Sequence, residues 1–207
     1  FWHTDKRRRK DKRRSGKINK TVKLSKEFFE QKTLKVAKDL LGKILCVRKN
    51  GKILRGIIVE TEAYRGEDDL ACHASKGRTK RTETLYKKAG TVYTYLIYGM
   101  HYCLNIVTEK ENYPSAVLIR GVTVEENRRI KTISGPASLS LGGPGRVCRH
   151  FGVDKTLNGL DVFGKNIWVE DGGLKISPRQ ILKSKRIGVN YAKHCQDYLW
   201  RFNLFLK

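Results

Sequence analysis

KILCVRKNGKILRGIIVETEAY, residues 43–64, contains two apolar runs separated by the dipeptide Asn50-Gly51. Asn-Gly readily adopts positive φ at both central positions of a two-residue turn. The pattern therefore predicts a β-hairpin, with one strand over 43–48 and a second over 53–62. Because hairpins of this kind build antiparallel sheets, the segment predicts the fold class of the whole chain.

Further helices and strands are predicted on both sides of this hairpin. Apolar residues at helical spacing predict a helix that begins near Thr33 and stops at Gly42. Strands are expected at 92–97, 102–108, 115–124 and 161–170, and a short helix is expected at 147–151, after the Gly-rich stretch 141–146. The mixture predicts a single α+β domain over residues 21–207, with a curved antiparallel β-sheet surrounded by helices.

Charge indicates the class of partner. The chain carries 44 Lys and Arg against 20 Asp and Glu, a formal net charge of +24. This excess indicates a polyanion, most simply nucleic acid. An anionic membrane surface is the weaker alternative, because no segment approaches the roughly 20 consecutive apolar residues of a spanning helix. Residues 1–20 are expected to form a disordered basic arm, either a solvated tail or a non-specific phosphate contact.

The cysteines and the first residues indicate the cellular context. The five cysteines are odd in number, widely spaced and never in a C-x-x-C pair, so neither a disulfide framework nor a zinc ribbon is expected. Reduced thiols indicate an intracellular protein. The start at Phe1, without an initiator methionine or the apolar region of a signal peptide, is expected of a fragment.

Two short segments carry residues suited to chemistry on a nucleobase. Glu60, Glu62 and Tyr64 alternate along the second predicted strand, so they are expected on one face. The stretch 93–102 gathers four tyrosines and a histidine. An enzyme that acts on a base in duplex DNA needs a wedge, a stacking pocket and cations for the backbone. Cleavage of the N-glycosidic bond also needs a carboxylate to activate water, for which Glu62 is the candidate.

At these residues the chain resembles the alkyladenine (3-methyladenine) DNA glycosylases of the single-domain type found in mammals and many bacteria. The resemblance spans roughly 28–202. Its marks are the ordered blocks LLGK (40–43), VETEAY (59–64), His73, GRT (77–79), YTYLIYGM (93–100), CLN (103–105), AVLIR (116–120), GPGR (143–146) and WRF (200–202).

The resemblance implies a role for each matched residue. Glu62 matches the general base that activates water, and Tyr98 matches the side chain that fills the gap left in the duplex. Asn105 matches the residue that disfavours the exocyclic amine of guanine. The matched residues that sandwich the extruded base are Tyr64, His73 and Tyr95, and those expected at the DNA backbone are Arg120, Arg146, Met100 and His101.

The resemblance also implies substrates and partners. Its members are monofunctional, metal-free hydrolases without a cofactor, and they remove 3-methyladenine, 7-methylguanine, hypoxanthine and etheno-adenine from double-stranded DNA. It implies a fold like the C-terminal domain of formyltransferases, a monomer, and a downstream abasic-site endonuclease. The expected compartment is the cytoplasm, in association with the nucleoid, for a bacterial source and the nucleus for a eukaryotic one.

The chain departs from the family pattern in two places. Val122-Thr-Val124 replaces the usual Glu-Pro, and 125–140 is short and basic, so a remodelled surface loop is expected there. In the block 80–86, Thr82, Leu85 and Tyr86 stand where Asn, Met and Phe are more frequent. A shifted base preference with unchanged chemistry is the expected result.

Three other functions stay open on the sequence. A metal-dependent nuclease could use a set of five acidic and histidine residues, namely Glu60, Glu62, Asp68, Asp69 and His73. A non-catalytic damage-binding protein would bind a lesion without releasing a base. A lyase variant would act through a lysine Schiff base, which the resemblance disfavours. Glu60 is expected to form structural hydrogen bonds, Asp68 and Asp69 to cap a loop, and Cys72 and Cys103 to pack.

Overall fold

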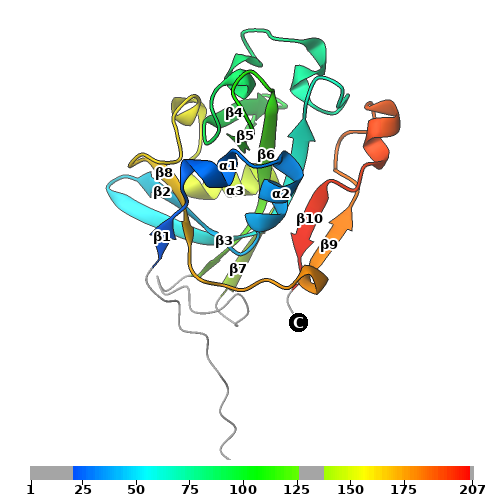
Figure 1. Cartoon of the computed structure of the whole chain (residues 1–207). Coiled ribbons are helices and arrows are strands. Elements are labelled where there is room, and N and C mark those ends of the chain that lie inside the picture. The colour runs from blue at the N-terminus through cyan, green and yellow to red at the C-terminus, as the bar shows by residue number, and fades with distance from the viewer. Residues whose placement is uncertain (1–20, 126–137, 206–207) are drawn as a thin grey trace, which may run out of the picture.

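The computed structural model describes residues 21–125 and 138–205, and within them one antiparallel sheet of ten strands dominates (Figure 1). The strands are β1 (Val22–Lys23), β2 (Ile44–Lys49), β3 (Lys52–Arg65), β4 (Val92–Ile97), β5 (His101–Val107), β6 (Ser115–Glu125), β7 (Ser138–Gly142), β8 (Ile167–Asp171), β9 (Ile181–Ser184) and β10 (Arg201–Leu204). The α-helices are α1 (Lys26–Phe29), α2 (Thr33–Asp39) and α3 (Pro144–Phe151). Short 3-10 turns are η1 (His73–Lys76), η2 (Glu83–Tyr86), η3 (Lys155–Leu157), η4 (Pro178–Gln180) and η5 (Lys193–Asp197).

The hairpin predicted around Asn50-Gly51 is confirmed. β2 pairs with β3, and Lys49 lies opposite Lys52 across the turn. Asn50 and Gly51 have φ values of 49° and 73°, the left-handed conformation that a two-residue hairpin turn requires. β3 then runs on for 14 residues and pairs with β6 over its second half, so it carries residues from the hairpin into the centre of the sheet.

β3 and β6 lie at the centre of the sheet, and each pairs with three other strands. The strand order is β1-β8-β2-β3-β6-β5-β4; off this path, β10 pairs with β3 and β9, and β7 pairs with β6. The register between β3 and β6 shifts on either side of Glu60, which marks a β-bulge. A bulge re-aims the side chains that follow it, and here Glu62 and Tyr64 follow.

The helices pack on the sheet through apolar faces. α2 buries Val36 and Ala37, and α3 buries Val147 and Phe151, all in the main hydrophobic core. Gly56 on β3 lies close to both β6 and α3, because a Cβ there would come within 2.4 Å of Val122 and 3.1 Å of Phe151. α3 contacts β5 and β6, and this contact holds its first turn beside the tip of the β4–β5 hairpin.

Several predicted elements need correction. The helices are few and short, so they do not surround the sheet as expected. α3 begins at Pro144 rather than 147, since proline suits the first position of a helix and Gly143 precedes it at φ 94°. The strand expected over 161–170 is confined to β8, because 161–164 form a turn capped by Asp161.

Some predictions fall partly outside the described residues. The basic arm over 1–20 lies outside them, as does 126–137 of the expected remodelled loop. The Val122–Val124 stretch lies in β6 and pairs with β7. In the described part of the chain, no helix combines the length and apolar character needed to cross a bilayer.

Candidate active site

A cavity of about 420 Å³ opens between the centre of the sheet and the loops at one end of it. Its walls come from β3, β4, β5 and β6, from the chain leading into η1, and from the irregular segment 187–191. The volume lies within the roughly 300–1,000 Å³ typical of small-molecule pockets. Most of the matched site residues line it, so the fold brings together residues that are up to 58 positions apart, from Glu62 to Arg120.

Glu62 lies on the β3 wall of this cavity, with no exposed surface of its own. The Tyr64 hydroxyl donates a 2.8 Å hydrogen bond to its Oε2, and the Ile187 backbone N–H donates a 2.9 Å hydrogen bond to its Oε1. Arg120 Nε is 3.6 Å from Oε1. Burial raises the pKa of Glu62, while Arg120 and the two donors favour the charged form. The carboxylate is thus a strengthened base held in one orientation.

Glu60 shares this face but is engaged differently. Its Oε1 accepts hydrogen bonds from Arg120 Nε at 3.0 Å and from Arg201 Nε at 2.7 Å. Both arginines come from strands next to β3, so Glu60 joins three strands through charged hydrogen bonds. These contacts agree with the structural role expected for Glu60.

Arg120 lies deeper than its predicted role implies. Its side chain is 14% exposed and contacts both Glu60 and Glu62. It also lines the cavity. The predicted contact between Arg120 and a nucleotide phosphate therefore remains a proposal, in which Arg120 would bridge the phosphate and the Glu60–Glu62 pair.

Aromatic rings form a continuous wall. His73 and Tyr95 meet edge to face with centroids 4.5 Å apart, and Tyr93 lies 5.4 Å from Tyr95. His73 Nδ1 is 2.9 Å from the Tyr93 hydroxyl. Burial, with Arg81 and Lys76 nearby, lowers the pKa of His73 to about 4, so the ring is neutral near pH 7. Neutral rings on this wall can stack on a flat, electron-poor base.

Asn105 is oriented by the sheet. It lies opposite Tyr93 in the β4–β5 ladder, is 3% exposed, and donates from Nδ2 to the Tyr93 carbonyl at 3.2 Å. The hydrogen bond fixes which way the amide faces. Asn105 lines the same cavity, as the specificity role implied by the resemblance requires.

The tip of the β4–β5 hairpin projects beside the cavity mouth. Tyr98 is 84% exposed with φ 51°, Gly99 has φ 67°, and Met100 is 73% exposed. A large apolar ring held out on a tight turn suits insertion into a duplex. His101 packs against Gly145 at the start of α3, where a Cβ would come within 3.0 Å of it, and Arg146 is exposed on the same turn.

Three parts of the site were missed by sequence reasoning. Tyr93 and Arg81 line the cavity, and Arg81 lies 5.9 Å from the Tyr95 ring. The segment 187–191 contributes a whole wall, and Arg186 just before it is buried. Tyr93 lay within a quoted motif and could have been chosen for its pairing with Asn105. Nothing in local periodicity marks Arg186 or the segment after it.

Three of the carboxylates that a nuclease would need for a metal form ion pairs with arginines instead. Glu60 and Glu62 face Arg120, and Asp69 pairs with Arg186 while it accepts the backbone N–H groups of Arg65 and Ala71. The loop-capping role expected of Asp69 is confirmed. In residues 21–125 and 138–205, no three His, Cys, Asp or Glu side chains come together as a metal site. The five cysteines are buried and free, as expected.

The comparisons with known proteins agree with this geometry. A family model described as methylpurine-DNA glycosylase matches residues 27–205. Relatives called "Putative 3-methyladenine DNA glycosylase" include one from Clostridium perfringens strain 13, with 43% identity over 87% of this chain and 95% of the relative. Another, from Rickettsia felis, has 44% identity over 89% of this chain and 94% of the relative. This chain therefore belongs to the methylpurine-DNA glycosylase family.

Proposed function

We propose that this chain extrudes an alkylated or deaminated purine from duplex DNA and hydrolyses its N-glycosidic bond, with Glu62 as the general base. Family membership supplies the reaction class. The observation that carries the assignment of Glu62 is its position: a fully buried carboxylate on an aromatic cavity, with two donors and Arg120 fixing it. The formyltransferase-like fold, the monomeric state and the downstream abasic-site endonuclease remain parts of this proposal, as does the domain range 21–207.

The proposed hydrolysis uses one water molecule. Glu62 takes a proton from this water as the water oxygen attacks the anomeric carbon. The bond between that carbon and the base nitrogen breaks, and the base leaves with the electron pair. The negative carboxylate also stabilises the oxocarbenium-like charge on the sugar. A ring that is already cationic, such as 3-methyladenine, leaves as a neutral molecule. A neutral ring such as hypoxanthine leaves as an anion and then takes up a proton, which balances the proton that Glu62 took from water.

The other residues bind and orient the nucleotide in this proposal. Tyr98 fills the space vacated in the duplex, which keeps the nucleotide from returning. Tyr64, His73 and Tyr95 stack on the base, and Asn105 disfavours the amino group of guanine. Met100, His101 and Arg146, near the cavity mouth, would contact the DNA backbone, and Arg120 would contact a nucleotide phosphate from inside the cavity.

The test is single-turnover release of hypoxanthine, 3-methyladenine and etheno-adenine from duplex DNA in EDTA. Wild-type protein should release at least one of these bases and leave an alkali-labile abasic site. Glu62→Gln should bind the lesion without releasing the base. Glu60→Gln is the matched carboxylate control. It should still release the base, because the hydrogen bonds of Glu60 join neighbouring strands of the sheet.

Other outcomes would identify other functions. Loss of wild-type activity in EDTA would support the nuclease. Borohydride trapping of a covalent adduct would support the lyase. Lesion binding that Glu62→Gln leaves unchanged, with no base released by either protein, would support a damage-binding role.

A further inference from the structure

We infer that Arg186 is a positioning residue for Glu62: it anchors the chain so that the next residue, Ile187, directs its backbone N–H at the Glu62 carboxylate. The inference rests on the proposed role of Glu62. Arg186 itself does not line the cavity, whereas Ile187 does. Arg186 is therefore expected to act on the reaction through Glu62 and its surroundings, and not by contact with the nucleotide.

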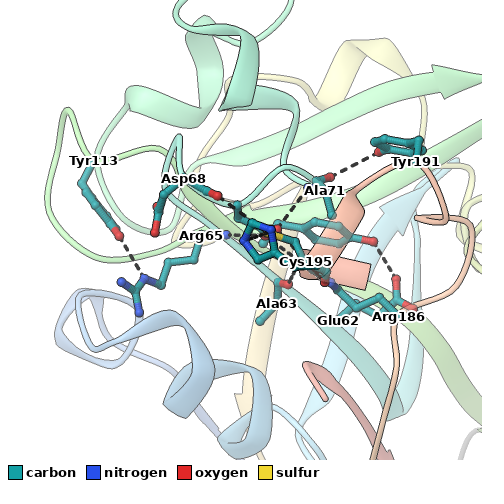
Figure 2. Close-up of polar contacts among 12 residues, drawn as sticks. Glu62, Ala63, Arg65, Asp68, Ala71, Tyr113, Arg186, Tyr191 and Cys195 are labelled. Carbon is teal, nitrogen blue, oxygen red and sulfur yellow. Dashed lines mark hydrogen bonds and ion pairs between the residues drawn. The ribbon is translucent and has the colours of Figure 1, made fainter. Parts of the chain in front are cut away.

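Arg186 is tied to the strand that carries the base. Its Nη1 donates a 2.9 Å hydrogen bond to the carbonyl of Ala63, the residue between Glu62 and Tyr64 on β3 (Figure 2). Its Nη2 donates to Asp69 Oδ1 at 2.8 Å and to the Cys195 carbonyl at 3.1 Å. One guanidinium thereby joins β3, the loop before η1, and η5.

The faces of the guanidinium are also occupied. Its central carbon is 4.9 Å from the Tyr64 ring and 5.0 Å from the Trp200 ring. Arg186 is only 4% exposed. A planar fork that both stacks and donates several hydrogen bonds is a property of arginine that lysine lacks. The hydrogen bonds and ring contacts at position 186 therefore require a planar guanidinium, and a positive charge alone would not make them.

The segment after Arg186 needs such an anchor. Residues 185–192 belong to no helix or strand, and Gly188 has φ 77°. The Ile187 N–H therefore has no ladder partner to fix it and donates to Glu62 Oε1 instead. The Arg186 side chain is bonded to the Ala63 carbonyl, and Ile187 follows Arg186 directly in the chain. Fixing Arg186 against β3 therefore places the Ile187 N–H 2.9 Å from Glu62 Oε1.

Other groups face Glu62 and contribute to its ionisation. From β3 come Tyr64 and Glu60, from β4 Tyr95, from β5 Cys103, from β6 Arg120, and from the segment before η5 Arg186. The Ile187 N–H is a neutral donor that stabilises the charged carboxylate more than the neutral carboxyl group. Its loss should raise the pKa of Glu62 without altering the other groups.

The experiment measures the pH dependence of single-turnover base release with saturating enzyme. Loss of one hydrogen bond to a charged group corresponds to a pKa change of about one unit or more. Arg186→Lys keeps the charge but not the fork, so the acid limb of its profile should move up by about one pH unit. At a pH within this acid limb the rate should fall about tenfold, with a smaller loss at the alkaline plateau. Asp69→Asn should shift the limb in the same direction.

Structural damage must be separated from positioning, because breaking a buried ion pair usually destabilises a protein. Thermal unfolding verifies that each variant is folded at the assay temperature. Arg55→Lys is the matched control, because Arg55 lies on β3 and does not line the cavity; the acid limb of this variant should stay at the wild-type pH. In addition, the amide resonance of Ile187 should follow Glu62 ionisation in the wild type and lose this response in Arg186→Lys.

Two results would overturn the inference or its premise, and they differ. Folded Arg186→Lys and Asp69→Asn with an acid limb at the wild-type pH would show that Arg186 only stabilises the fold, even if the plateau falls. Base release by Glu62→Gln at the wild-type rate would instead reject Glu62 as the base. The amide response of Ile187 would remain a direct test of the contact in that case.

Discussion

The carboxylate of Glu62 combines two opposing demands at the scale of a single residue. Burial disfavours its charge, whereas the base in the proposed hydrolysis must be charged. Arg120, Ile187 and Tyr64 oppose the cost of burial through an ion pair and two donors. The raised pKa indicates that the cost of burial is the larger effect. A group optimised for proton abstraction is thereby expected to reduce the stability of the fold.

This expectation predicts how Glu62→Gln changes stability with pH. The pKa of Glu62 is higher in the folded than in the unfolded chain, so its favourable contribution to stability is present below the unfolded pKa and is lost as pH rises through the folded pKa. Glutamine does not ionise. The free energy of unfolding of the variant, relative to wild type, should therefore increase between pH 4 and pH 8 in urea titrations. A difference that decreases with pH would show that Arg120 and the two donors outweigh burial.

His73 gives the opposite pH dependence. Its pKa is lowered from 6.5 to about 4, so its contribution to stability is present above about 6.5 and is lost as pH falls toward about 4. In NMR titrations the His73 ring should stay neutral from pH 8 to pH 5. His73→Gln should unfold less steeply with acid over the same range. A His73 resonance that titrates near 6.5 would contradict the lowered pKa.

At the scale of elements, two hairpin turns contain residues in the same left-handed backbone conformation, but the residue types differ in how well they tolerate it. Asn50-Gly51 joins β2 to β3 with residue types that tolerate positive φ. Residues 98–100 join β4 to β5, and they include a tyrosine, Tyr98, in the same conformation, which is unfavourable for its backbone. A strained, exposed aromatic residue is expected where function rather than stability selects it.

Tyr98→Gly should therefore separate stability from activity. Glycine accepts φ 51° freely, and the 84% exposed ring contributes little packing. The free energy of unfolding should stay within about 1 kcal/mol of wild type or exceed it. Single-turnover release should fall about ten- to hundredfold, the usual cost of losing one aromatic stacking contact with a base. Release at the wild-type rate would reject the insertion role of Tyr98.

Gly51→Ala should have the reverse effect. A Cβ at this position meets no atom within 4 Å, so the cost is confined to the backbone at φ 73°. The free energy of unfolding should fall by about 1 kcal/mol, measured by urea titration. Base release should not change, since this turn lies at the other end of β3 from Glu62. A matching loss of activity would indicate that the hairpin and the site are coupled.

At the scale of the whole molecule, the net charge and the cavity are expected to have separate roles. The net charge of +24 belongs to the chain as a whole, while the lining of the cavity includes aromatic rings and one buried carboxylate. Charge should therefore set the affinity for DNA and the cavity should set the choice of base.

DNA affinity should fall steeply with salt. If about six phosphates are contacted, the logarithm of the association constant should decrease with the logarithm of salt concentration with a slope of about −5. The slope should be similar for undamaged and lesion-containing duplexes in fluorescence anisotropy titrations. The single-turnover rate at saturating enzyme should change little. A slope near zero would show that the basic residues do not contact the backbone.

Local sequence was sufficient for much of the fold. The turn at Asn50-Gly51, the strands at 92–97 and 115–124, and the helix beginning at Thr33 depend on φ preferences and on apolar periodicity over a few neighbours. The same information misplaced the start of α3 and extended β8 too far. It did not predict β9 and β10, which are short and flanked by basic residues.

The sequence by itself determined the antiparallel hairpin, the polyanionic partner and the presence of a carboxylate beside tyrosines. Only the tertiary structure decided that Glu62 is buried, that Arg120 contacts it from a strand 58 positions away, and that the Ile187 N–H reaches it across 125 positions. The reason is physical. Turns and strands follow from short-range backbone energetics, whereas the ionisation and orientation of a buried group depend on which distant residues exclude water from it.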